Sequence, residues 1–239
     1  MNPETVPDFS VIAIDGPAAS GKSTVARKLA RRLGFSYVNS GALYRGIAWL
    51  ANAHSIPPND AVAVYSRVRK SVFSFELQGK ELIFLIDGES PEPHLRDEQV
   101  NRSVSAISAI AEVREFLVAH LREFLTWDNL VMEGRDIGSM VFPDTLYKFY
   151  IDASLEVRAQ RRAVQGQPDD LFFRDRADSS RRASPLTIAE DAHVIDSSSL
   201  TIDGVVGEIK SKPASVVAGF RLGLVMPRLR GASLSRPVV

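Results

Sequence analysis

The strongest constraint on this chain is an eight-residue motif near its N-terminus. Residues 16–23 read Gly-Pro-Ala-Ala-Ser-Gly-Lys-Ser and match the pattern G-x-x-x-x-G-K-[ST]. Residues 11–15, just before the motif, have the apolar, β-branched pattern of a buried strand, and residues 22–33 have the apolar spacing of an amphipathic helix. A strand, a glycine-rich turn and a helix in this order predict a phosphate-binding loop (P-loop) within an α/β fold.

Each residue type in this loop has a part in binding a nucleoside triphosphate. The glycines let the backbone direct several N–H groups toward phosphate oxygens, and the start of the helix adds its positive end. We expect Lys22 to reach the β- and γ-phosphates of ATP and Ser23 to ligate Mg²⁺. The predicted ATP-binding residues are Gly16, Pro17, Ala18, Ala19, Ser20, Gly21, Lys22, Ser23 and Thr24.

Strand and helix patterns alternate along most of the chain, which predicts a five-stranded parallel sheet with helices on both faces. The stretch 62–108 differs, because residues 72–87 read as an antiparallel hairpin around Gln78-Gly79-Lys80. We therefore predict a core over 10–61 and 109–213, an inserted region with its own small antiparallel sheet over 62–108, and a loosely ordered tail over 214–239.

Composition narrows the classes of function. Lys plus Arg and Asp plus Glu each number 29, and this zero net charge argues against a nucleic-acid-binding surface, which usually carries excess positive charge. The absence of cysteine excludes disulfides, thiolate metal sites and cysteine nucleophiles. Because neither a signal-peptide pattern nor a membrane-spanning stretch is found, we expect a cytoplasmic protein with no membrane partner. We also expect a monomer with no nucleic-acid partner.

Seven arginines lie between residues 158 and 182, where no lysine occurs. Guanidinium is a planar fork that binds phosphate through two parallel hydrogen bonds. Arg174 and Arg181 fall in a polar stretch between a helix and a strand, which favours a lid over about 163–185 that closes on the phosphates. For the first three arginines a solvated helix face is favoured instead, namely Arg158, Arg161 and Arg162.

Two further motifs follow predicted strands. Ser40 is expected to cap a helix that carries Arg45, and Arg135 and Asp136 come directly after the buried-strand pattern of residues 130–133. Ligand sites of open α/β sheets form at the carboxyl ends of strands, so both motifs are candidate anion sites. On spacing alone, a surface salt bridge explains Arg45 or Arg135 about equally well.

Taken together, these motifs resemble those of the bacterial cytidylate kinase family, P-loop enzymes that act on nucleoside monophosphates. The resemblance covers about residues 11–207, with several motifs in the family's order. The motifs are Ile-Asp-Gly-Pro-Ala-Ala-Ser-Gly-Lys-Ser-Thr at 14–24, Asn-Ser-Gly-Ala-Leu-Tyr-Arg at 39–45, Val-Arg-Glu-Phe-Leu at 113–117, Glu-Gly-Arg-Asp-Ile-Gly-Ser-Met-Val-Phe-Pro-Asp at 133–144, and Arg-Asp-Arg-Ala-Asp-Ser-Ser-Arg-Arg-Ala-Ser-Pro-Leu at 174–186.

The resemblance implies ATP-dependent phosphorylation of CMP and dCMP to CDP and dCDP, with Mg²⁺ as cofactor. It also implies that the inserted region binds the nucleoside monophosphate. The implied catalytic residues are Lys22, Arg135, Arg174 and Arg181. The implied CMP-binding residues are Arg45, Arg135 and Arg181 for the phosphate, Ser105, Arg114 and Asp136 for the cytosine with Ser40 close by, and Asp178 for the sugar hydroxyls.

The chain departs from the family pattern in two places. Asn39 stands where the family often has aspartate, and the lid segment before Arg174 is short. Loss of the aspartate charge is expected to weaken an arginine contact, and the short segment bears on closure of the lid.

Three other classes of function would make different demands on the sequence. A kinase with a hydroxyl acceptor would need a carboxylate placed as a base and fewer phosphate-binding arginines. A nucleotide-dependent switch would need segments ordered by the γ-phosphate and a patch for a partner. A nucleic-acid-binding module is disfavoured by the neutral charge and by the lack of aromatic residues among basic ones.

Overall fold

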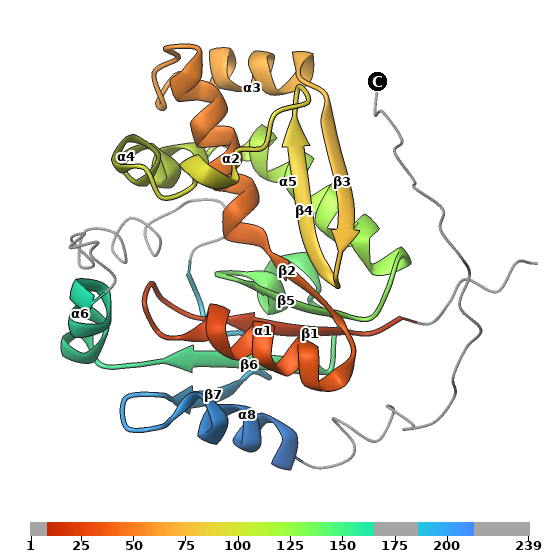
Figure 1. Ribbon diagram of the computed structural model, residues 1–239, viewed down its shortest axis with the longest axis vertical. Helices are drawn as coiled ribbons and strands as arrows, with labels where there is room; N and C mark the ends of the chain where they lie inside the picture. Colours follow the sequence, from red (N-terminus) through yellow and green to blue (C-terminus); the bar gives the residue numbers. More distant parts are fainter. Residues whose placement is uncertain (1–8, 165–185, 213–239) are drawn as a thin grey trace, which may run out of the picture.

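A seven-stranded sheet forms the centre of the computed structural model, which describes residues 9–164 and 186–212 (Figure 1). The strand order is β3-β4-β2-β5-β1-β6-β7, and the last five of these strands are all parallel to their neighbours. The predicted parallel core is therefore confirmed. Its strands are β1 (Val11–Asp15), β2 (Ser36–Asn39), β5 (Leu130–Gly134), β6 (Tyr147–Asp152) and β7 (His193–Asp196).

The hairpin of β3 (Phe73–Gln78) and β4 (Glu81–Ile86) is antiparallel, as predicted, but it does not form a separate sheet. β4 joins β2 through one register pair, Tyr37 with Glu81, and the Tyr37 N–H donates to the Lys80 carbonyl at 2.8 Å. The edge of β2 would otherwise present unpaired backbone groups, and the hairpin covers them. The sheet thus has seven strands where five were expected, and the boundaries of the inserted region stay a prediction.

Alternation along the strands sorts the core into two layers. Ile12 and Ile14 face one side of the sheet, where α1 (Lys22–Leu33) and α8 (Ile202–Ser211) pack. Val11 and Ala13 belong to the larger cluster on the other side, together with residues of α2 and α5. The remaining helices are α2 (Ser40–Ala53), α3 (Ala61–Lys70), η1 (Glu92–His94), α4 (Glu98–Ile107), α5 (Ala111–Glu123), η2 (Phe124–Thr126), η3 (Ile137–Val141) and α6 (Leu155–Val164).

The upper half of Figure 1 is built around α2, which runs from the sheet edge into a group formed by the hairpin, α3, α4 and α5. Within the predicted inserted region only the hairpin was expected, yet the structure also has α4, whose buried face is formed by Val100, Val104 and Ile107. Throughout residues 9–164 and 186–212, no helix has both the length and the apolar character needed to cross a membrane.

The cap of α2 also differs from expectation. Asn39, not Ser40, is its capping residue, and the Asn39 Oδ1 accepts a hydrogen bond from the Ala42 N–H at 3.1 Å. The Ser40 hydroxyl instead donates to the Glu133 carbonyl at 2.8 Å. The predicted cap is therefore wrong by one residue, because the serine hydroxyl is hydrogen-bonded to β5, a strand distant in sequence.

The π-helical turn η3, which follows β5, is capped from another strand. Asp15, the last residue of β1, accepts hydrogen bonds from the N–H groups of Ile137 and Gly138, both at 2.8 Å. Burial raises the pKa of Asp15 to about 6, against the lowering effect of these two bonds; the charge of Asp136 also raises it and that of Lys22 lowers it.

This buried carboxyl predicts a pH-dependent contribution to stability. Since the pKa rises from 3.8 to about 6 on folding, the folded protein keeps a proton that the unfolded chain has lost between these pH values. The free energy of unfolding therefore falls as pH rises through this range, by about 3 kcal/mol at about 1.4 kcal/mol per pH unit.

The measurement is urea unfolding of the wild type and of Asp15→Asn, which cannot ionise at this position. We expect the stability of the wild type relative to the variant to be about 3 kcal/mol smaller at about pH 7 than at about pH 3, which lies below both pKa values. A relative stability that does not change with pH would contradict this.

Candidate functional site

Three strand ends meet at one edge of the sheet and bring the sequence motifs together. Asp15 of β1 pairs with Gly134 of β5, and Asn39 of β2 pairs with Glu133 of the same strand. The P-loop, the start of α2 and the Arg135-Asp136 segment therefore leave the sheet side by side. This is the carboxyl edge of the parallel strands, where α/β proteins form ligand sites.

The backbone of the P-loop adopts conformations that favour glycine. Gly16 has φ +151° and Gly21 has φ +91°, and Ala19, between them, has φ +60°. A Cβ atom on Gly16 would lie 2.1 Å from the carbonyl oxygen of Ile151, so no other residue fits there. No side chain caps the start of α1, and its first turn holds no acidic residue, as suits a helix end that receives an anion.

Lys22 is buried and lies within the loop that it serves. Its Nζ donates to the Pro17 carbonyl at 2.9 Å, across the turn of the motif. Ser23 is half-buried one residue further along α1, and Thr24 is exposed. The Lys22 ammonium thus lies within the turn of the P-loop, and Ser23 follows it in the first turn of α1.

Side chains from α6 and from the end of β7 hold the outer side of the P-loop. The Arg158 Nη1 donates to the Ala18 carbonyl at 3.2 Å, and the Arg161 Nη1 donates to the Ser20 carbonyl at 3.2 Å. The Ser197 hydroxyl donates to the Ser20 carbonyl at 2.8 Å. Arg158 is buried, so the expected solvated face is wrong at this residue, and the two arginines fix the loop by binding its carbonyl oxygens.

Ser40 and Gly134 are packed tightly where β2 and β5 end. A Cβ atom on Gly134 would lie 2.6 Å from the Ser40 Oγ, so the glycine is needed for this close approach. One turn along α2, the Arg45 Nη1 donates to the Leu95 carbonyl at 2.8 Å and to Asn101 Oδ1 at 2.7 Å. These bonds orient the Arg45 guanidinium between α2 and α4.

Arg114 and Asp136 form a buried ion pair at the end of β5. The Arg114 Nη2 donates to Asp136 Oδ2, its Nη1 donates to the Ser108 carbonyl at 3.2 Å, and its guanidinium lies 5.5 Å from the centre of the Tyr44 ring. Ser105 is half-buried on α4, and its carbonyl accepts from the Ser108 hydroxyl at 3.1 Å. The predicted base-reading residues thus come from α4, α5 and the start of η3.

Arg135 lies between Gly134 and Asp136 in sequence; it is half-buried, and its Nη1 donates to the Gly134 carbonyl at 3.4 Å. Ser40, Arg135, Asp136 and the P-loop are brought together by the aligned strand ends. Three predicted site residues lie outside the described residues: Arg174, Asp178 and Arg181. Most of the predicted lid and the predicted tail lie outside them too.

Glu133 belongs to the motif at 133–144, but no role was predicted for it. It is the next-to-last residue of β5, with only 2% of its surface exposed, and its Oε1 accepts from the Tyr37 hydroxyl at 2.8 Å. Burial and the Glu133 charge raise the pKa of Tyr37 well above its usual value, so the hydroxyl stays a donor. The Arg27 guanidinium lies over the Tyr37 ring, 4.6 Å from its centre, and helps to hold the ring in place. An acidic residue at the end of a buried strand was the signal available.

Two side chains with oxygen donors, Ser23 and Glu133, belong to the elements that meet at this edge. Within the described parts of the chain, no cluster of three or more His, Asp or Glu side chains is arranged to bind a metal ion. Mg²⁺ usually takes one or two protein oxygens together with substrate phosphates and waters. The Ser23 hydroxyl and the Glu133 carboxylate are oxygen donors of this kind.

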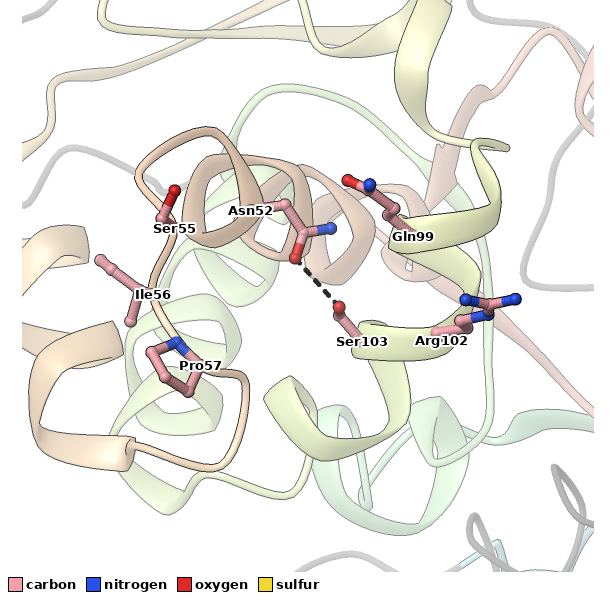
Figure 2. A pocket seen from close by; sticks show the side chains of 7 residues that line it. All are labelled: Asn52, Ser55, Ile56, Pro57, Gln99, Arg102 and Ser103. Atoms are coloured by element: carbon pink, nitrogen blue, oxygen red, sulfur yellow. Dashed lines mark hydrogen bonds between the residues drawn. The ribbon is translucent and has the colours of Figure 1, made fainter.

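A polar depression lies away from these residues, between the C-terminal end of α2 and α4 (Figure 2). In it the Ser103 hydroxyl donates to Asn52 Oδ1 at 3.0 Å. No predicted site residue lines the depression. The lining residues are Asn52, Ser55, Ile56, Pro57, Gln99, Arg102 and Ser103.

Comparison with known proteins agrees with this geometry. The sequence pattern of the family described as Cytidylate kinase matches residues 12–214. The cytidylate kinase of Caldanaerobacter subterraneus subsp. tengcongensis is 42% identical over 83% of this chain and 92% of its own length. That of Streptococcus pyogenes serotype M5 is 38% identical over 86% of this chain and 96% of its own length. The chain therefore belongs to the cytidylate kinase family.

Proposed function

We propose that this protein transfers the γ-phosphoryl group of ATP to the phosphate of CMP or dCMP, giving ADP and CDP or dCDP. The observation that carries the proposal is the edge where β1, β2 and β5 end. A P-loop lies on one side of β5 and a polar, arginine-containing site on the other. Two nucleotides bound there would meet with their phosphates end to end.

The acceptor in this reaction is a phosphate oxygen, which is already anionic at neutral pH and needs no base. Asp15 is the carboxylate nearest to the P-loop in sequence, and both of its oxygens accept backbone hydrogen bonds from Ile137 and Gly138. These bonds give Asp15 a structural part at η3.

Positioning and neutralisation of charge would supply the catalysis. Lys22 and the P-loop N–H groups would hold the ATP phosphates, and Arg45 and Arg135 would hold the CMP phosphate. Ser23 and Glu133 would hold Mg²⁺, which when bound neutralises charge on the phosphates of ATP. The parts assigned to Arg174, Arg181 and Asp178 stay predictions from the family resemblance. The cytoplasmic location and the monomeric state stay predictions from the sequence.

Cytosine would be read by hydrogen bonds. Its exocyclic amine is a donor, which suits the Asp136 carboxylate, and Arg114 holds that carboxylate in place. Uracil carries a carbonyl oxygen at the same position, and this oxygen would face the carboxylate without a shared proton. A polar site that is left unpaired by the wrong base discriminates strongly.

The proposal is tested by ADP release from ATP with CMP, dCMP, UMP, AMP or cytidine as acceptor. We expect release with CMP and dCMP, and none with cytidine, which offers only hydroxyl groups. Release with cytidine would indicate a hydroxyl-acceptor kinase. ATP binding without release on any acceptor would indicate a switch.

Lys22→Ala and Arg135→Ala are each expected to lower kcat/KM for CMP by about a hundredfold or more, the scale for loss of one contact to the transition state. The matched control is Lys28→Ala on α1, whose partly exposed ammonium pairs with Asp203 at the surface. This control should keep near-normal turnover. Near-normal turnover of either site variant would remove that residue from the mechanism.

Asp136→Ala is expected to lower the ratio of kcat/KM for CMP to that for UMP by at least about tenfold, because it removes the acceptor for the cytosine amine. The ratio is measured with purified enzyme on both substrates at saturating ATP. An unchanged ratio would show that another group reads the base.

A further inference from the structure

Two aspartates make different contacts at the start of η3. A residue that precedes a helical turn usually accepts hydrogen bonds from that turn's first N–H groups through its own side chain. Asp136 occupies this position before η3, yet its side chain makes no such bond and pairs with Arg114 instead. The N–H groups of Ile137 and Gly138 are bound by Asp15, which comes from β1.

We propose that Asp15 is a positioning residue for the base-reading site: it caps η3 in place of Asp136 and so leaves the Asp136 carboxylate to Arg114 and the cytosine. The inference rests on the proposed function, since it assigns Asp15 a part in the choice between CMP and UMP. Asp15 itself touches neither nucleotide in this scheme.

Burial explains why the cap decides where Asp136 points. Ile137 and Gly138 are both buried, and a buried N–H group needs an acceptor. If the Asp15 carboxylate were removed, the carboxylate one residue before Ile137 would be the local acceptor, in the ordinary capping position. Asp136 would then turn toward η3 and away from Arg114, and the cytosine amine would lose its acceptor.

Lys148 also packs against Gly138, and its partner Asp191 provides a control residue for the Asp15 variant. A Cβ atom on Gly138 would lie 3.0 Å from the Lys148 side chain, so the lysine stem packs directly against this turn. The buried Lys148 ammonium binds both oxygens of Asp191, at 2.8 and 2.7 Å. Asp191 thus supports the same turn, but it gives no hydrogen bond to η3.

The test compares Asp15→Asn with Asp191→Asn in the full chain. Asparagine offers one acceptor oxygen in place of two, so we expect Asp15→Asn to lower the ratio of kcat/KM for CMP to that for UMP by at least about tenfold, with KM for ATP changed by less than about threefold. Asp191→Asn also removes a carboxylate from this region and should leave the ratio unchanged. If Asp15 had only a structural role, its substitution would lower kcat/KM for CMP and for UMP by the same factor.

Asp15→Glu provides a second variant if Asp15→Asn fails to fold. It keeps the charge but displaces the carboxylate by one methylene, and it should lower the same ratio to a smaller extent. A wild-type ratio in either folded variant would overturn the inference.

A measurement on the wild type needs no variant. The charged groups near Asp15 are Lys22, Asp136 with its partner Arg114, and Lys148, which packs on Gly138. Protonation of Asp15 as the pH falls through about 6 weakens the cap, so the CMP to UMP ratio should fall there, whereas ionisation of the substrate phosphates cancels in the ratio. A constant ratio across this range would overturn the inference.

Failure of the inference and failure of the proposed function give different results. If the wild type prefers CMP and the Asp15 variants keep that preference, the part assigned to Asp15 is wrong and the kinase assignment stands. If the wild type does not phosphorylate CMP at all, both are wrong.

Discussion

The position of β5 between β1 and β2 is the constraint on which the rest of the site depends. Because all three strands are parallel and in register at their carboxyl ends, the segments that follow them emerge at one edge. One segment is the P-loop, another begins α2, and the third holds Arg135 and Asp136. Hydrogen bonds between these segments, from Ser40 to Glu133 and from η3 to Asp15, then hold the three against one another.

The part of this arrangement that is local in sequence could be predicted. The P-loop, the five core strands and the positions of Arg135 and Asp136 follow from short patterns of apolar, glycine and charged residues. Features that depend on distant partners could not. Asp15 reads as the end of a strand, and only the fold places Ile137 beside it. Arg158 reads as part of a helix surface, and only the packing of α6 against the P-loop buries it.

Arginine has two different uses in this protein, and sequence does not separate them. Arg158 and Arg161 of α6 donate to carbonyl oxygens of the P-loop, so these two arginines stabilise the conformation of the loop. Arg45 is oriented between α2 and α4 by a carbonyl and an amide oxygen, and Arg114 is oriented by a carboxylate. A guanidinium with five N–H donors can bind the protein on one side and present further donors on another. The zero net charge of the chain is therefore compatible with strong local anion sites.

The junction between the hairpin and the core has a mechanical consequence. β4 shares one register pair with β2, whereas β1 and β5 share five. The side chains that reinforce this junction, Arg27 and Arg31 with Glu81, lie partly in solvent, where dissolved ions screen their attraction. If the sheet were pulled apart, the β2–β4 pairing at Tyr37 and Glu81 would separate before the strand pairs of the parallel core. This separation would need less force in concentrated salt.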